Sequence, residues 1–297
     1  MAIARGSART FALAGGAAIV LAACTGSTRG SYQYDWSLFV DSIIHPDGLI
    51  LFGIWLTISI SIVSQLIGVV LGVFGALGRM SRFLPFRLVA NFYVWFLRGT
   101  PLLVQLTFFY FGLSVTKLYT WPPINLLGVV IPSEVQAGVF ALGLNEGAYM
   151  TEIVRAGILS VDRGQMEAAK SLGMTYGQAM RRIILPQAAR IIVPPLGNEF
   201  NNMLKTTSLL VILGNVPELY VTFSRKNGSL FHPFELFLAA AFWYLVLTTI
   251  WSLFQTWIER RLARGTPGAP SEGPGLRDRL FGVRRSSADA SLVSGGR

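Results

Sequence analysis

The sequence has few charged residues and a single cysteine. Only 13% of its 297 residues are Asp, Glu, Lys or Arg, 52% are hydrophobic, and the mean hydropathy is +0.53. Soluble domains carry about 25% charged residues, so an ordinary soluble fold is excluded and the composition predicts an integral membrane protein. The lone Cys24 excludes an internal disulfide and a thiolate metal cluster.

Histidine is scarce, and the dipeptide Gly-Lys does not occur. His45 and His232 each precede a proline beside an apolar run, so we expect loop positions and no bis-histidine haem or metal site in the bilayer. Without Gly-Lys there is no G-x-x-x-x-G-K-[ST] phosphate-binding loop. We therefore predict that this chain binds no cofactor or metal.

The net charge of +10 would favour a nucleic-acid partner in a soluble chain. Here the Lys and Arg residues lie mostly in short stretches between apolar runs, where they set the orientation of membrane spans. Nucleic acid is therefore not among the predicted partners.

The first 24 residues have the layout of a secretory signal. Arg5 and Arg9 precede an apolar stretch, and small residues lead to Cys24, as in the lipobox of bacterial lipoproteins. The alternatives are cleavage with lipidation of Cys24, or an uncleaved anchor helix. In both cases residues 25–48 form an extracytoplasmic segment.

Five further segments are long and apolar enough to form membrane spans of about 20 residues. They are Leu49 to Leu77, Leu88 to Leu113, Glu134 to Leu159, Ile191 to Val216, and Pro233 to Ile258. The predicted fold class is an all-α integral membrane protein with a five-span core in residues 49–262, preceded by the signal or anchor helix.

The arginines and lysines predict the orientation of this core. They concentrate in the first and third loops of the core and after the last span, whereas the alternate loops hold few. The positive-inside bias therefore places the N-terminus of the core outside and its C-terminus in the cytoplasm. Residues 263–297 read as a disordered cytoplasmic tail, whose LRDRLFGVRR stretch either rests on anionic membrane lipid or is solvated.

Gly68, Gly72 and Gly75 recur at helical spacing in the first core span. Small residues on one face let a second helix approach closely, so we interpret them as a packing surface.

The long cytoplasmic loop, about residues 158–190, has a helical pattern of its own. Good helix formers run from Glu167 to Leu172, and we place Glu167 in the first turn, where the helix dipole favours an acid. Gly173 allows a bend, a second helical run extends from Tyr176 to Ile184, and Pro186 is expected to stop it.

This loop resembles the EAA motif of permease subunits of bacterial ABC importers. The matching positions are Glu167, Ala168, Ala169, Gly173, Ile183, Leu185 and Pro186. The stretch from Arg98 to Gln105, the segment from Gly147 to Gly157 and the run Lys205 to Leu209 are similar to the branch that carries polar amino acids. The resemblance covers about residues 48–262; the lipobox-like start lies outside the family pattern.

The resemblance implies a multi-pass permease in the bacterial cytoplasmic (inner) membrane. Its implied partners are a second permease copy or a paralogue, a separate ABC ATPase that uses ATP and Mg²⁺, and an extracytoplasmic substrate-binding protein. It also implies that the helix from Glu167 to Leu172 seats in the ATPase and couples hydrolysis to transport, so this chain is a transport subunit and not an enzyme.

Two polar stripes run through otherwise apolar spans and must face protein or water. One comprises Asn198, Asn201 or Asn202, and Lys205, with Glu199 beside it; the other comprises Asn145, Tyr149 and Glu152, with Glu146 beside it. One interpretation is a pathway in which the ammonium of an amino acid meets Glu146 or Glu199 and its carboxylate meets Lys205 or a helix end. The other is pairing among the protein's own charges, such as Glu152 with Arg155 at i+3 or Glu199 with Lys205 of a neighbour.

Arg98, Gly99 and Pro101 predict a kink in the second core span, because proline removes a helical hydrogen bond and glycine eases the bend. The Arg98 guanidinium could contact substrate or satisfy carbonyls freed by the kink, and we favour the second role.

The rival functional classes fit the sequence less well. A secondary transporter driven by an ion gradient needs no coupling loop and usually shows an internal repeat, which we do not find. An intramembrane enzyme would need a catalytic pair or metal cluster within the spans. A purely structural membrane protein leaves the EAA pattern unexplained.

Overall fold

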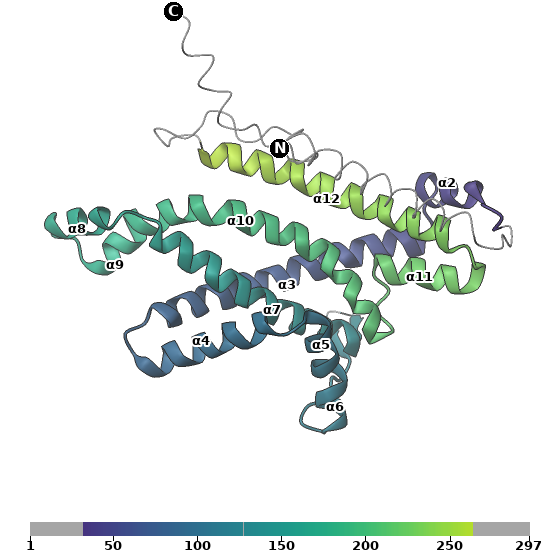
Figure 1. Ribbon diagram of the computed structural model, residues 1–297, viewed down its shortest axis with the longest axis horizontal. Coiled ribbons are helices and arrows are strands. Elements are labelled where there is room, and N and C mark those ends of the chain that lie inside the picture. The colour runs from purple at the N-terminus through teal and green to yellow at the C-terminus, as the bar shows by residue number, and fades with distance from the viewer. Residues whose placement is uncertain (1–31, 127, 264–297) are drawn as a thin grey trace, which may run out of the picture. The chain divides into compact units, whose positions relative to one another are not determined.

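The computed structural model describes residues 32–126 and 128–263, and this part of the chain is mainly helical (Figure 1). The predicted signal or anchor at residues 1–24, including Cys24, and almost all of the predicted tail lie outside the described residues. The chain divides into two units, residues 1–36 and 37–297, and the contacts below belong to the second.

The helices and strands of the described residues follow one another along the chain. In sequence order they are α2 (Trp36–Ile44), α3 (Gly48–Met80), α4 (Leu84–Gly99), α5 (Leu102–Thr107), the π-helical turn η1 (Phe108–Gly112), α6 (Leu113–Val115), β1 (Ile124–Leu126), β2 (Val129–Ile131), α7 (Ser133–Leu159), α8 (Arg163–Ser171), α9 (Tyr176–Ala179), the π-helical turn η2 (Met180–Ile184), α10 (Leu185–Thr206), the 3₁₀ helix η3 (Thr207–Leu213), α11 (Leu219–Leu230) and α12 (Pro233–Ala263).

The long helices occupy the segments predicted as spans. Two of them, α3 and α12, are long and apolar enough to cross a membrane by length and composition, and the stretch Leu102–Val115 is a shorter apolar helix. Figure 1 shows α3, α10 and α12 running along one direction, with α8 and α9 at one end and α11 at the other. The helices α8 and α9 therefore lie at the opposite end of the helical bundle from α11.

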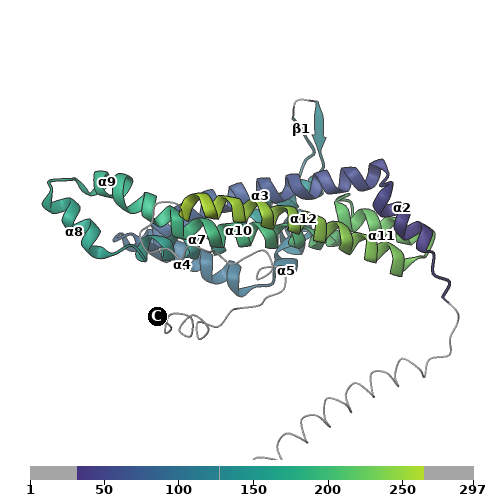
Figure 2. The same cartoon turned by 90° about the horizontal axis from the view of Figure 1, so that it is seen from above.

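The structure differs from the predicted all-α, five-span arrangement in three ways. β1 and β2 pair as a small antiparallel hairpin that stands out from the helices in Figure 2. The second predicted span is not one helix, because it breaks between Gly99 and Leu102 and contains η1. The predictions from sequence did not include α2 or α11, which are too short to span a bilayer.

The packing of α3 on α7 confirms the interpretation of the glycine face. A Cβ at Gly68 would lie 2.5 Å from Cγ of Glu146, and one at Gly72 would lie 2.9 Å from the carbonyl carbon of Met150. Gly75 meets Thr151 in the same way. The two helices therefore approach so closely that no side chain fits at these positions.

A buried carboxylate begins α11. Glu218 caps the helix by accepting from the backbone N–H groups of Val221 at 2.7 Å and Tyr220 at 3.0 Å, and the Tyr244 hydroxyl of α12 donates to it at 2.8 Å. Thr57 of α3 also donates to this carboxylate, at 3.4 Å. One side chain thus holds three helices together, which the sequence pattern did not indicate.

We predict that Gly72→Leu destabilises the protein, because its side chain must displace α7 at Met150. Overpacking of this kind costs about 1–3 kcal/mol, so the thermal unfolding midpoint of the detergent-solubilised protein should fall. Gly228→Ala is the control, since it lies in α11 with open space around a Cβ. An unchanged midpoint for Gly72→Leu would contradict the close packing.

Candidate functional site

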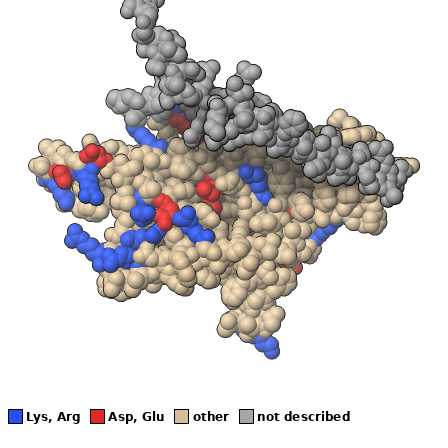
Figure 3. Space-filling view, in the orientation of Figure 1, with Lys and Arg blue, Asp and Glu red and all other residues tan. Residues whose placement is uncertain are grey.

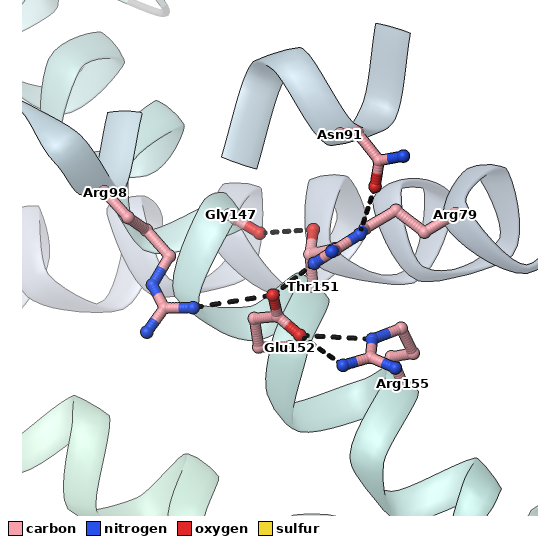
Figure 4. A network of polar contacts seen from close by, with 7 residues as sticks. All are labelled: Arg79, Asn91, Arg98, Gly147, Thr151, Glu152 and Arg155. Atoms are coloured by element: carbon pink, nitrogen blue, oxygen red, sulfur yellow. Dashed lines mark hydrogen bonds and ion pairs between the residues drawn. The ribbon is translucent and has the colours of Figure 1, made fainter. Parts of the chain in front are cut away.

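Charged side chains gather on one face of the bundle, over α4, α7 and α10, and again at the α8 and α9 end (Figure 3). Glu152 of α7 interacts with three guanidinium groups from three helices. Figure 4 shows Arg79, Arg98 and Arg155 all pointing at its carboxylate. We call these four residues the Glu152 cluster.

Each arginine reaches the carboxylate from a different direction. Arg155 lies one turn further along α7 and donates to Oε2 through Nε at 3.1 Å and Nη2 at 3.0 Å. Arg98, at the end of α4, has Nη1 3.5 Å from Oε1. Arg79, in the last turn of α3, pairs with Oε1 and also donates through Nε to Asn91 at 2.7 Å.

The Glu152 cluster carries more positive than negative charge, because one carboxylate faces three guanidinium groups. Arg98 is the most accessible, with 41% of its side chain exposed, and its guanidinium lies over the Tyr149 ring at 5.0 Å from the centroid. Arginine presents several donors in a planar fork that matches a carboxylate. The cluster can therefore bind a further anion on its exposed side.

The carbonyl groups freed at the break after α4 are satisfied by amides and not by Arg98. Gln105 Nε2 donates to the carbonyls of Leu97 at 2.7 Å and Thr100 at 3.1 Å, and Asn145 Nδ2 donates to Leu97 at 3.2 Å. The role we favoured for Arg98 from the sequence is thus filled by other residues. The break itself falls at Gly99, Thr100 and Pro101, where the sequence predicts a kink.

The pathway candidates of the sequence separate into two groups. Asn198, Asn202 and Lys205 are exposed along one face of α10. Glu146 is only 5% exposed and accepts from Gln65 of α3 at 3.1 Å, so it points into the contact between α3 and α7.

The remaining candidates lie between these extremes. Glu199 of α10 is half-buried. Tyr149 and Glu152 both contact Arg98, whereas the Asn145 amide donates to the Leu97 carbonyl at the break between α4 and α5. The pairing of Glu152 with Arg155, expected as an alternative, is present.

Sequence reasoning assigned no role at this site to Arg79, Asn91 or Gln105. We counted Arg79 as a loop residue because the predicted span ended at Leu77, but α3 continues to Met80 and places Arg79 in its last turn. Gln105 is the last residue of the stretch from Arg98 to Gln105 and lies four residues after Pro101. This spacing is the one feature of the sequence that could have indicated that its side chain caps the break.

The first helix of the loop between α7 and α10 is α8, and it begins earlier than predicted. Asp162 caps it by accepting from the backbone N–H of Gly164 at 2.6 Å, so the helix starts at Arg163. Glu167 therefore lies in the second turn and not in the first, and the dipole argument for its position was wrong. Glu167 and Ala168 are exposed, while Ala169 is buried.

Gly173 ends α8 in a left-handed conformation, with φ of 79°. Its N–H bonds to the Lys170 carbonyl at 2.9 Å, and the next N–H, of Met174, bonds to Ala169 at 3.1 Å. This is a Schellman motif, in which glycine avoids the strain that a Cβ would bring. The glycine of the EAA pattern is thus required by the backbone.

Pro186 does not stop the second helical run, contrary to the prediction. The run begins at a capping box of Thr175 and Gln178, and α9, η2 and α10 then follow without a gap up to Thr206. In the wide turn η2 the N–H of Leu185 bonds to Met180, so Pro186 sits in the first turn of α10, where a missing N–H is tolerated. Ile183 and Leu185 lie at this junction.

Comparison with known proteins places this geometry in a family. Residues 68–264 match the family described as "Binding-protein-dependent transport system inner membrane component". The arginine transport system permease protein ArgU of Corynebacterium glutamicum is 46% identical over 216 residues, which cover 71% of this chain and 67% of that protein. The probable glutamine ABC transporter permease protein GlnM of Bacillus subtilis is 39% identical over 77% of this chain and 95% of its own length.

Solved structures agree with these relatives. A chain from "Crystal structure of an amino acid ABC transporter with histidines" superposes with a TM-score of 0.67 at 39% identity, and covers 77% of this chain and 100% of its own. A chain of the MetNI methionine ABC transporter in an inward-facing conformation has a TM-score of 0.58 at 18% identity, over 73% of this chain and 97% of its own. The second likeness concerns the fold alone.

We predict that Glu152→Gln lowers the stability of the solubilised protein by ~1–2 kcal/mol, between the values for exposed and buried ion pairs. The reason is that three guanidinium groups lose the anion that holds α3, α4 and α7 together. Thermal unfolding measures this. Arg79→Gln should then cost less in the Glu152→Gln background than in the wild type, and equal costs would refute the coupling between the two side chains.

Proposed function

The chain belongs to the family of binding-protein-dependent transport system inner membrane components, and we propose that it is the permease subunit of an ATP-driven importer of polar amino acids. Two findings support this proposal together: residues 68–264 match the family, and the relatives are named as arginine, glutamine and cystine permeases. An ion-coupled secondary transporter is not favoured, because these relatives are permease subunits of ABC transporters.

We propose that five segments cross the bacterial cytoplasmic membrane: α3, the broken segment from α4 to α6, α7, α10 with η3, and α12. The positive-inside bias supports an outer N-terminus for this core and a cytoplasmic C-terminus. In this orientation α8 and α9 lie on the cytoplasmic side, and the β1–β2 hairpin and α11 lie toward the outside.

The proposed assembly contains two permease chains, either two copies or this chain with a paralogue. A separate ATPase uses ATP and Mg²⁺, and an extracytoplasmic binding protein delivers the amino acid. Glu167 and Ala168 of α8 are exposed, so this helix can present a carboxylate and a small side chain to the ATPase.

Movement of the ATPase can reach the membrane through one continuous helical segment. The chain runs from Tyr176 through η2 and α10 to Thr206, and the Schellman motif at Gly173 ends α8 shortly before this segment begins. Closure of the ATPase pair against α8 would therefore tilt α10, as in other importers whose halves rock as rigid bodies. Asn198, Asn202 and Lys205 lie on the exposed face of this helix.

The charged face over α4, α7 and α10 is the proposed substrate pathway. The exposed guanidinium of Arg98, with Arg155 beside it, suits the carboxylate of an amino acid, and Glu199 suits its ammonium group. Lys205 offers a second cation for the carboxylate further along α10. Glu146 is less suited to the ammonium, because it is buried and engaged by Gln65.

ATP-dependent uptake by proteoliposomes that contain the permease, its ATPase and its binding protein tests this function. We predict that Gly173→Asp abolishes coupling, because it strains a left-handed position and puts a negative charge at the C-terminal end of α8. Uptake should fall by about tenfold or more, equivalent to ~1.4 kcal/mol, while the amount of inserted permease stays unchanged.

Gly177→Asp is the matched control, since Gly177 is exposed, has open space and adopts no positive φ. Glu167→Ala should behave like Gly173→Asp. Normal uptake by both loop variants would refute the coupling role of α8, and uptake without ATP would refute the importer itself.

A further inference from the structure

The break between α4 and α5 is closed by one buried amide. Gln105 is 4% exposed, and its Nε2 lies 2.7 Å from the Leu97 carbonyl oxygen, 2.8 Å from the Thr100 hydroxyl and 3.1 Å from the Thr100 carbonyl oxygen, so its two N–H groups are shared among these three acceptors. A single side chain therefore ties the end of α4 to the start of α5.

The Leu97 carbonyl needs such a donor for a definite reason. In a continuous helix it would accept from the N–H four residues later, but that residue is Pro101, which has none. In lipid no water can replace the lost bond. Gln105 and Asn145 both donate to this one carbonyl, so the proline that breaks the helix also creates the acceptor on which the joint is built.

Asn145 brings α7 into the same joint. Its Nδ2 donates to the Leu97 carbonyl at 3.2 Å and to Oε1 of Gln105 at 3.0 Å. Asn145, Tyr149 and Glu152 follow one another at i, i+4 and i+7 along α7, which places them on one helix face. Asn145 holds Leu97, while Tyr149 and Glu152 both contact Arg98, the next residue of α4.

We propose that Gln105 and Asn145 are positioning residues that lock the α4–α5 break against α7 and thereby hold the Arg98 guanidinium where it meets the substrate carboxylate. This inference rests on the proposed function of Arg98. It gives Asn145 a different role from the one that the sequence suggested, because its amide binds the protein and not the amino acid. It also gives a reason for two features of the stretch from Arg98 to Gln105: Pro101 breaks the helix, and Gln105 donates to the carbonyl that the break exposes.

Isosteric variants test the proposal. Gln105→Glu and Asn145→Asp keep the size of each side chain, but they replace an amide that donates two hydrogen bonds by a carboxyl group that donates one when protonated and none when ionised. The assay is equilibrium dialysis on the solubilised permease–ATPase complex without binding protein. The probes are whichever of radiolabelled L-arginine, L-glutamine or L-cystine the wild type binds, together with its α-carboxamide.

We expect each variant to raise the Kd of the amino acid about tenfold, equivalent to ~1.4 kcal/mol. The Kd of the carboxamide should stay unchanged, because it lacks the charge that Arg98 recognises. Arg98→Gln should give the same selective loss, and adding Gln105→Glu to it should bring no further loss. Gln136→Glu is the matched control, since its amide also donates to two carbonyls, of Pro122 and Ile131, but at the outer hairpin.

The outcomes separate the two levels of the proposal. If Arg98→Gln binds both probes as the wild type does, the carboxylate site of the proposed function is wrong. If Arg98→Gln loses the amino acid selectively while Gln105→Glu and Asn145→Asp bind normally, the positioning role is wrong. Equal weakening for both probes in the Gln105 and Asn145 variants would mark a general structural defect and would also overturn it.

Discussion

A chain in lipid must satisfy its own polar groups, and the described structure follows from that constraint. The carbonyl that Pro101 leaves without a donor receives two amides, and the carboxylate of Glu218 is met by backbone and hydroxyl donors from three helices. Charged side chains also gather on one face over α4, α7 and α10 (Figure 3). A face of this kind must meet water or protein, which supports the proposal that it forms the substrate path.

The proposed pathway and the proposed coupling loop are joined by α10. This helix carries exposed polar side chains, yet its other side packs on α12, where the indole N–H of Trp251 donates to the Gly197 carbonyl at 2.7 Å. A Cβ at Gly197 would lie 2.6 Å from Cδ of Gln255, so the two helices touch closely. The helix that follows η2 thus packs closely on α12 at Gly197, so in the proposed mechanism a displacement of α8 would move this pair of helices.

The sequence predicted these features as far as they depend on periodicity and on fixed motif spacing. Apolar length located the long helices, the glycine spacing located the packing face of α3, and the EAA pattern pointed to the family. The two wrong predictions for the loop helices came from local backbone hydrogen bonding, which the spacing of residue types does not show. Asp162 starts α8 four residues before Glu167, and the wide turn η2 lets the helix pass Pro186. The Glu152 cluster and the Gln105 joint depend on which helices meet in space, which no spacing within one segment specifies.

The most direct measurement is the water accessibility of the α10 face inside the membrane. Cys24 is the sole cysteine, so Cys24→Ala gives a background for Asn202→Cys, with Leu253→Cys on an exposed apolar position of α12 as the control. In membranes holding the whole transporter, we expect a charged methanethiosulfonate reagent to label position 202 rapidly, transported amino acid to slow that labelling, and position 253 to react little. Labelling at 253 as fast as at 202, without protection by substrate, would contradict a polar pathway along α10.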